Sequence, residues 1–270
     1  MEKPKILYIS QEISPYLPET PMSVRGRMIP TGVQEKGYEV RTFMPKYGSI
    51  NERRNQLHEV IRLSGMNLII DDSDHPLIIK VATLQPTRMQ VYFIDNDDYF
   101  SNSPVKDLEI NLSPDDNDER TMFFVRGVVE TVKKLRWAPA VIHCSGWISA
   151  LAPLYLRRMY GDDPAFRDAR IVYSITDPST LPAALDARFA EKLMMDVFSA
   201  DDIKALGDGP FDIPALTRIA AEYADGVIAA HPDLDPAIVD AARQSGKPFL
   251  DYCAEITDAV EKYIAFYKSL

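Results

Sequence analysis

The sequence predicts an α/β fold: a single Rossmann-like domain on a doubly wound parallel sheet, with an inserted antiparallel hairpin region. Two observations predict the sheet. Short, nearly continuous apolar runs recur along the chain, and segments of helical periodicity alternate with them. This pattern is typical of parallel strands that are covered by helices on both faces. A third observation, a series of apolar runs separated only by turn signals between about residues 57 and 95, predicts the insert.

The amino-terminal elements are a strand, a helix, a second strand and then the insert. KILYIS (5–10) and EVRTFMP (39–45) are apolar runs rich in β-branched and aromatic residues, and a helical pattern over 22–36 joins them. In the insert, LHEVIRL, MNLIID, HPLIIKVATL and MQVYFID follow one another. Because no helical segment separates these runs, we expect antiparallel hairpins there.

The second half returns to strict alternation. The expected strands are AVIHC (140–144), RIVYSIT (170–176) and GVIAA (226–230), and the expected helices cover 118–136, 147–159, 183–196, 213–224 and 233–245. A last helix is expected at about 254–268, because Ile256, Val260, Ile264 and Tyr267 fall on one stripe that would dock on the domain. No repeat or Gly/Ser linker interrupts the chain, so the simplest count is one domain over 1–270.

Composition narrows the function classes. The chain has 270 residues, 46% of them hydrophobic and 26% charged, which is typical of a soluble globular protein. The formal net charge of -10 disfavours nucleic acid and anionic membranes as partners. No apolar run approaches the roughly 20 residues of a membrane span, and the amino terminus lacks a signal peptide, so a cytoplasmic location is expected. Cys144 and Cys253 lie too far apart to indicate a disulfide framework or a zinc site.

In a parallel sheet, ligands bind beyond the carboxyl ends of the strands. Around those ends lie KILYISQEISPY, GYEVRTFMPKYG, DNDERTMFFVRGVVE, VIHCSGWISALAPLYL and EYADGVIAAHP. In order and spacing, these segments resemble the amino-terminal domain of bacterial glycogen synthases and plant starch synthases over roughly residues 4–245. The resemblance implies one half of a GT-B fold, whose two Rossmann-like domains face a cleft. It also implies transfer of glucose from ADP-glucose or UDP-glucose to an α-1,4-glucan, with no metal and no cofactor.

The loop after the first strand departs from the family pattern. Family members carry Lys-Thr-Gly-Gly-Leu-Gly-Asp there, and its glycine N–H groups and lysine approach the donor phosphates. The positions of the lysine, the threonine and the glycine pair are occupied in this chain by Pro18, Glu19, Thr20 and Pro21. Proline offers no N–H, and Glu19 would repel a diphosphate. The sequence therefore predicts that the donor loop is lost.

Two further family sites are degenerate. The His-Asn pair that follows the strand RIVYSIT in the family aligns with Thr176 and Asp177, and threonine cannot hold a sugar at the reach of histidine. The family segment His-x-His/Asn-Asp-Trp reads His143 to Trp147 here, with Gly146 at the position of the acidic residue. No confident catalytic residue remains.

Three candidates for ligand binding survive, each with a structural alternative. Glu12 either faces the cleft or caps a local turn. His143 is either a general base or a hydrogen-bonded structural histidine. Trp147 either stacks on a sugar or packs in the core. Asp95-Asn96-Asp97 has a metal-binding form found in sugar transferases of another fold, but its short length indicates no metal site.

Nucleophilic catalysis is not indicated. Cys144 and Ser145 lie outside any Gly-x-Ser-x-Gly elbow.

Two functional hypotheses therefore remain. The favoured one is a non-catalytic homologue that binds an α-glucan or another sugar, or that has a regulatory role. The alternative is a glucosyltransferase that is completed by a partner protein chain carrying the second domain.

Overall fold

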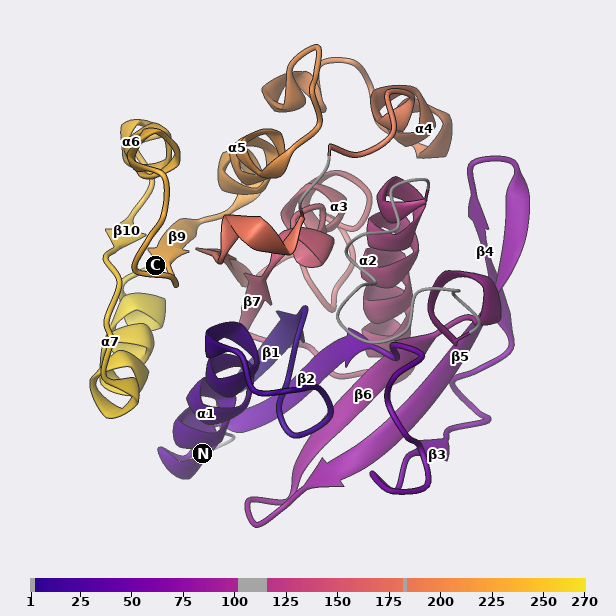
Figure 1. Cartoon of the computed structure of the whole chain (residues 1–270), viewed down its shortest axis with the longest axis vertical. Coiled ribbons are helices and arrows are strands. Elements are labelled where there is room, and N and C mark those ends of the chain that lie inside the picture. The colour runs from indigo at the N-terminus through magenta and orange to yellow at the C-terminus, as the bar shows by residue number, and fades with distance from the viewer. Residues whose placement is uncertain (1–2, 102–115, 182–183) are drawn as a thin grey trace.

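A computed structural model of the chain describes residues 3–101, 116–181 and 184–270 (Figure 1). The described strands form one ten-stranded sheet. Their bounds are β1 (Lys5–Ser10), β2 (Glu39–Pro45), β3 (His58–Glu59), β4 (Met66–Ile70), β5 (Ser73–Leu84), β6 (Met89–Asp95), β7 (Val141–Ser145), β8 (Arg170–Ile175), β9 (Gly226–Ala229) and β10 (Phe249–Leu250). The order across the sheet is β10-β9-β8-β7-β1-β2-β6-β5-β3, and β4 pairs with β5.

The predicted parallel sheet is confirmed. All five apolar runs expected to form it are strands, and β1 pairs in parallel with both β2 and β7. The predicted insert is correct in kind, since β5 runs antiparallel to β3, β4 and β6. Strand β6 also pairs in parallel with β2, so it belongs to the main sheet and only β3 to β5 are added to it.

The helices lie on both faces of the sheet (Figure 1). Their bounds are α1 (Pro21–Glu35), α2 (Asn117–Lys134), α3 (Ala152–Arg158), α4 (Phe189–Asp196), α5 (Ile213–Tyr223), α6 (Pro236–Gln244) and α7 (Ile256–Ser269). Helices α1 and α7 pack together, whereas α2, α3, α5 and α6 contact one another in sequence. The right-handed crossover rule places these two groups on opposite faces, because the chain moves across the sheet in opposite directions in the two halves.

Two predicted helices were too long. The segment 147–159 divides into a 3₁₀ turn over Trp147–Ser149 and the helix α3. Pro153 sits in the first turn of α3, where its missing N–H costs nothing, so a new helix starts there. Helix α4 starts at Phe189, because the side chain of Asp186 accepts the backbone N–H of Arg188 and forms a turn. Residues 182–183 lie outside the described part of the chain.

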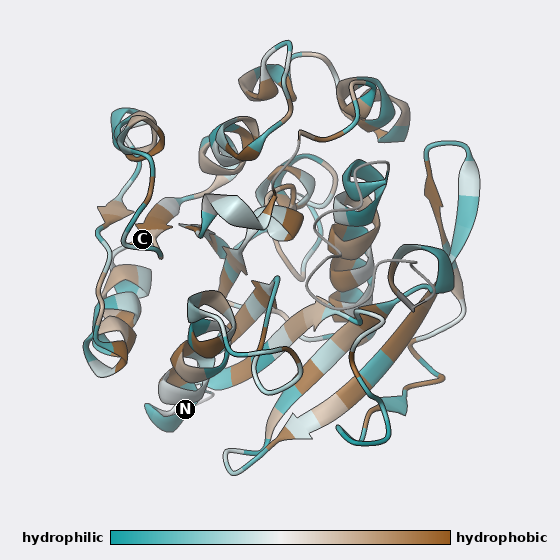
Figure 2. Ribbon diagram, in the orientation of Figure 1, coloured by the Kyte–Doolittle hydropathy of each residue, from teal (hydrophilic) through white to brown (hydrophobic). Residues whose placement is uncertain are grey.

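The core lies on both faces of the central strands. Strands β1, β7, β8 and β9 are buried along almost their whole length, as expected for strands covered on both sides. In Figure 2 the hydrophobic residues gather on these strands and along α2. The predicted carboxyl-terminal helix is present as α7 and buries Val260, Ile264 and Tyr267 against the rest of the molecule. Both cysteines are buried and free.

In the described segments, no helix has the length and apolar character that crossing a bilayer requires.

Candidate functional site

A cavity of about 210 Å³ lies beyond the carboxyl ends of β1 and β8. These ends are where a parallel sheet places its ligands. The loop after β1, the first turn of α1 and the loop after β8 supply its lining, which consists of Glu12, Thr20, Pro21, Met22, Asp177, Ser179 and Thr180. The fold thus brings together two of the segments in which the sequence departs from its family pattern, the donor loop and the pair Thr176-Asp177.

The segment that aligns with the donor loop of the family forms the N-terminal cap of helix α1. Thr20 is the N-cap residue of α1: its hydroxyl accepts the N–H of Ser23 at 2.9 Å, and its own N–H donates to the Ser23 hydroxyl at 2.9 Å. Pro21 fills the first helical position, and the Ser23 hydroxyl also donates to the carbonyl of Pro18 at 2.9 Å. Much of the free hydrogen-bonding capacity of this helix start is therefore used internally.

Glu12 lies between the helix cap and the cavity. Its side chain is 4% exposed, and its Oε2 accepts the hydroxyl of Thr20 at 2.7 Å. Its Oε1 faces the amide of Gln11, whose Nε2 donates at 3.4 Å. Burial raises the pKa of Glu12 above its usual range, and the negative charge of Asp177 adds to the effect. Both alternatives for Glu12 thus have a structural counterpart, since it supports a local turn and also lines the cavity.

Asp177 forms the other acidic wall. Its side chain is 36% exposed, its Oδ1 accepts the N–H of Ser179 at 2.8 Å, and its Oδ2 lies 4.0 Å from Nε2 of His231. His231 accepts the N–H of Asp233 on its Nδ1 at 3.2 Å, so in the neutral ring the proton is on Nε2 and faces Asp177. Thr176 is nearly buried and does not line the cavity. The position of the family histidine therefore does not face this site.

Trp147 is part of the core. It is 1% exposed, and its indole N–H donates to the carbonyl of Thr180 at 3.1 Å, behind the cavity wall. Its burial rules out sugar stacking in this conformation. Gly146, beside it, has a φ of 91°. A Cβ there would lie 2.6 Å from both Cβ and Oε1 of Gln11, so the space of the family carboxylate is filled.

His143 does not reach the cavity. It lies within β7, and its ring nitrogens are each 2.6 Å from a hydroxyl: Nδ1 from Tyr267 of α7 and Nε2 from Ser174 of β8. Burial lowers its pKa to about 3, and the charge of Arg25 acts in the same direction. A neutral imidazole held by two hydroxyl groups under a helix matches the second of the two sequence-based alternatives, a hydrogen-bonded structural histidine.

The Asp95-Asn96-Asp97 segment is also tied into the fold. Oδ2 of Asp95 accepts the ammonium of Lys80 at 2.7 Å, and the Asn96 side chain accepts the N–H groups of Asp98 and Tyr99. Within the described ranges, no group of three or more His, Cys, Asp or Glu side chains is arranged to hold a metal ion. Burial raises the pKa of the Cys144 thiol, which disfavours its nucleophilic form.

Sequence reasoning missed four residues at this site: Gln11, Ser179, Thr180 and His231. A signal existed for two of them, because Gln11 follows β1 and His231 follows β9 at the edge where ligands bind. Ser179 and Thr180 belong to a 3₁₀ turn that no motif marks.

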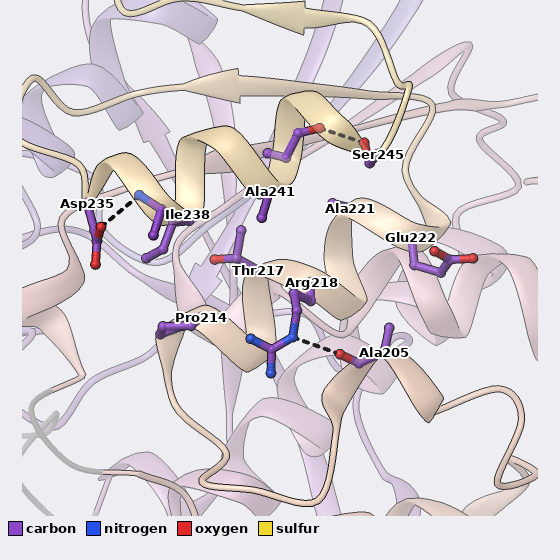
Figure 3. Close-up of a pocket in the computed structure, with 12 residues that line it drawn as sticks. Ala205, Pro214, Thr217, Arg218, Ala221, Glu222, Asp235, Ile238, Ala241 and Ser245 are labelled. Atoms are coloured by element: carbon purple, nitrogen blue, oxygen red, sulfur yellow. Dashed lines mark hydrogen bonds between the residues drawn. The ribbon is translucent and has the colours of Figure 1, made fainter.

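A second cavity, of about 360 Å³, lies between α5 and α6 (Figure 3). Small residues, among them Ala221 and Ala241, form much of its surface, and Thr217 and Ile238 lie between the two helices. Arg218 is engaged there, because its guanidinium donates to the carbonyls of Ala205 and Leu206, each at 3.1 Å. Among the described residues, none from the loops after β1, β7 or β8 lines it. It is separate from the candidate site.

Comparison with known proteins identifies the family. The model of the starch synthase catalytic domain matches residues 5–208. The chain belongs to the starch synthase catalytic domain family. Within this family it is 34% identical over 232 residues to a glycogen synthase of Chlorobium phaeobacteroides and 33% identical over 230 residues to one of Pelodictyon phaeoclathratiforme. Both matches cover 83% of this chain and 47% of the relative. The chain therefore spans about half the length of these curated relatives.

The fold agrees with this assignment. The structure matches the catalytic domain of starch synthase IV from Arabidopsis thaliana, solved with ADP and acarbose, with a TM-score of 0.74. The match covers 96% of this chain and 53% of that one, at 16% sequence identity. The likeness establishes the shared architecture, one half of a GT-B arrangement. The chemistry of this family member has to be argued from its own side chains.

Proposed function

We propose that this chain is a non-catalytic relative of the glycogen and starch synthases that binds the end of an α-glucan in the cavity between Glu12 and Asp177. The observation that carries the proposal is the replacement of a phosphate-binding helix start by a closed cap faced by two carboxyl groups. A nucleotide sugar carries a negatively charged diphosphate. The carboxyl groups would repel it, and the N–H groups of the helix start are already engaged in the cap, so this site disfavours binding of a nucleotide sugar.

The same cavity favours a neutral sugar, which carries no charge for the carboxyl groups to repel. Its hydroxyl groups are donors, and carboxylate oxygens are strong acceptors for them. Around the two carboxyl groups, the side chains of Thr20, Ser179 and Thr180 add hydroxyls to the lining. The volume, about 210 Å³, is below the roughly 300–1,000 Å³ of pockets for drug-sized ligands, which favours a single sugar residue. The similarity to glycogen synthases favours a glucose unit of an α-glucan.

Thermal unfolding with two ligands tests the proposal. Maltotriose at ten times its Kd should stabilise the protein by about 1.4 kcal/mol, a rise in Tm of about 3 °C. ADP-glucose and UDP-glucose at millimolar concentration should leave Tm unchanged. Asp177→Asn should weaken maltotriose binding about tenfold in calorimetry, because one charged acceptor is lost. Asp162→Asn, at an exposed position, is the matched control and should bind like the wild type.

A second candidate function rests on the length of the match. Because the chain spans 47% of the glycogen synthase of Chlorobium phaeobacteroides, a partner chain that carries the remaining half could complete a glucosyltransferase. Under that hypothesis, ADP-glucose would raise Tm when the partner chain is present, and maltotriose binding would not depend on Asp177. A rise of several degrees that requires the sugar nucleotide would replace the first proposal by the second.

A further inference from the structure

Gln11 lies buried between the cavity and the loop after β7. It is 1% exposed, its Oε1 accepts the backbone N–H of Trp147 at 3.1 Å, and its Nε2 donates to Oε1 of Glu12 at 3.4 Å. Only one orientation of the amide satisfies both neighbours, because a backbone N–H can only donate. The amide group therefore has to turn its N–H groups toward the carboxyl of Glu12.

The orientation of Gln11 depends on the glycine at position 146. The Cβ that any other residue would carry there would lie 2.6 Å from Cβ and Oε1 of Gln11, closer than atoms can approach. The φ of Gly146, 91°, is also one that other residues rarely adopt. Gly146 thus leaves the space in which the Gln11 side chain lies. The two positions form one unit, in which an amide from the loop after β1 fills the place where the family resemblance expects a carboxylate from the loop after β7.

Both oxygens of Glu12 consequently accept a hydrogen bond from a neighbouring side chain. Gln11 donates to Oε1 at 3.4 Å, and Thr20, anchored as the cap of α1, donates to Oε2 at 2.7 Å. A carboxylate oxygen has two acceptor positions, so each can accept one more donor. We propose that Gln11 is the positioning residue of the sugar cavity: with Gly146 it holds the Glu12 carboxylate in the orientation in which it accepts a sugar hydroxyl. This inference rests on the proposed function.

The ionisation of Glu12 depends on the groups that surround it. The titratable groups that act on Glu12 from neighbouring elements are Asp177, in the loop after β8, and Tyr47, in the loop after β2. Tyr47 stays neutral, because burial raises its pKa well above the usual range. The Gln11 amide favours the ionised form of Glu12 and so lowers its pKa, against the larger effect of burial. Loss of this donor should therefore raise the pH at which Glu12 becomes ionised and both of its oxygens become charged acceptors.

The experiment follows the Glu12 carboxyl carbon by NMR in protein labelled at the glutamate side chains, with the signal assigned by its loss in Glu12→Gln. Gln11→Glu keeps an acceptor for Trp147 but replaces the donor to Glu12 by an oxygen. We expect the titration midpoint of Glu12 to rise by about one pH unit in this variant. The lower limit of the pH range for maltotriose binding should rise with it. Gln244→Glu, at an exposed position of α6, should leave both midpoints unchanged.

A second measurement needs no variant. In the wild type, the side-chain N–H signals of Gln11 should shift with the same midpoint as the Glu12 carboxyl. An unshifted Glu12 midpoint in Gln11→Glu, or Gln11 signals that do not follow the titration, would overturn the positioning role. Absence of maltotriose binding in the wild type would instead overturn the proposed function, while the two NMR midpoints still decide the role of Gln11.

Discussion

The imidazole of His143 shows how one buried polar side chain can be stable without a charge. Its two nitrogens lie 2.6 Å from the hydroxyls of Tyr267 and Ser174, and the Tyr267 hydroxyl is 3.1 Å from that of Tyr8. Hydroxyl groups both donate and accept, so the neutral ring is fully satisfied. The charged ring would need to donate from both nitrogens in a site shielded from water. This is the physical reason that its pKa falls to about 3.

The free energy of unfolding should therefore depend on pH through His143. Below about pH 6.5 the unfolded chain binds a proton at this residue and the folded chain does not, so stability declines as the pH falls from about 6.5 toward 3. Lowering the pH from 7 to 5 should reduce the free energy of unfolding by about 2 kcal/mol through His143. We expect denaturant unfolding to show this loss in the wild type but not in His143→Gln. The exposed His58→Gln should behave like the wild type, and equal losses in the wild type and His143→Gln would contradict the assignment.

At the scale of elements, the contact between α1 and α7 depends on close approach. Gly32 of α1 faces Val260 of α7, and a Cβ at position 32 would lie 2.6 Å from Cγ2 of Val260. Arg25 lies about two turns before Gly32 on the same face of α1. Its guanidinium donates to the carbonyl of Cys253 at 2.9 Å, just before α7 begins. The missing side chain at Gly32 thus allows α7 to lie close enough for Tyr267 to reach His143.

The effect of Gly32→Ala on the free energy of unfolding should change sign when Val260 is also replaced. Gly32→Ala gains helix propensity of about 1 kcal/mol, but overpacking against Val260 costs about 1–3 kcal/mol, so we expect a net loss of stability of about 1 kcal/mol. In a Val260→Ala background the clash is absent, and Gly32→Ala should stabilise the protein by up to about 1 kcal/mol. A denaturant-based double-mutant cycle measures both values. Additive effects would mean that the two helices do not meet at these residues.

At the scale of the whole molecule, the proposed function predicts the absence of glucosyl transfer. Retaining transfer needs cations and backbone dipoles aimed at the leaving diphosphate, and each such donor is worth about 10²- to 10³-fold in rate. Where the family resemblance expects these donors, this chain has the helix cap at Thr20 and the carboxyl groups of Glu12 and Asp177. We expect the purified chain to incorporate no radiolabelled glucose from ADP-glucose or UDP-glucose into glycogen.

Restoring the family loop should not rescue transfer. A variant with Lys, Thr, Gly and Gly at positions 18–21 regains a loop for phosphate, but Glu12 and Asp177 still face it. Glucose incorporation above that of a heat-inactivated control, by either protein, would return this chain to the catalytic members of the family.

The sheet and its helices could be predicted from the sequence, because burial on both faces leaves an apolar run for every central strand and a periodic stripe for every covering helix. It also located the altered segments, since Pro18, Pro21 and Gly146 stand where the family pattern requires other residues. The interruption of 147–159 and the late start of α4 escaped detection because local turns formed by Trp147 and Asp186 compete with helical periodicity.

The cavity that the altered segments form together could not be predicted from the sequence, because it depends on how the chain folds in three dimensions. Glu12 and Thr20 come from the loop after β1 and Asp177 from the loop after β8, and nothing in their spacing predicts that they enclose one cavity. The same holds for Lys192, whose ammonium lies 2.7 Å from the buried Asp118 carboxylate although 74 positions separate them in the sequence. Periodicity reports only whether a residue is buried, whereas hydrogen bonds depend on which atoms the chain brings within about 3 Å. That distance is set by the crossovers of the whole sheet.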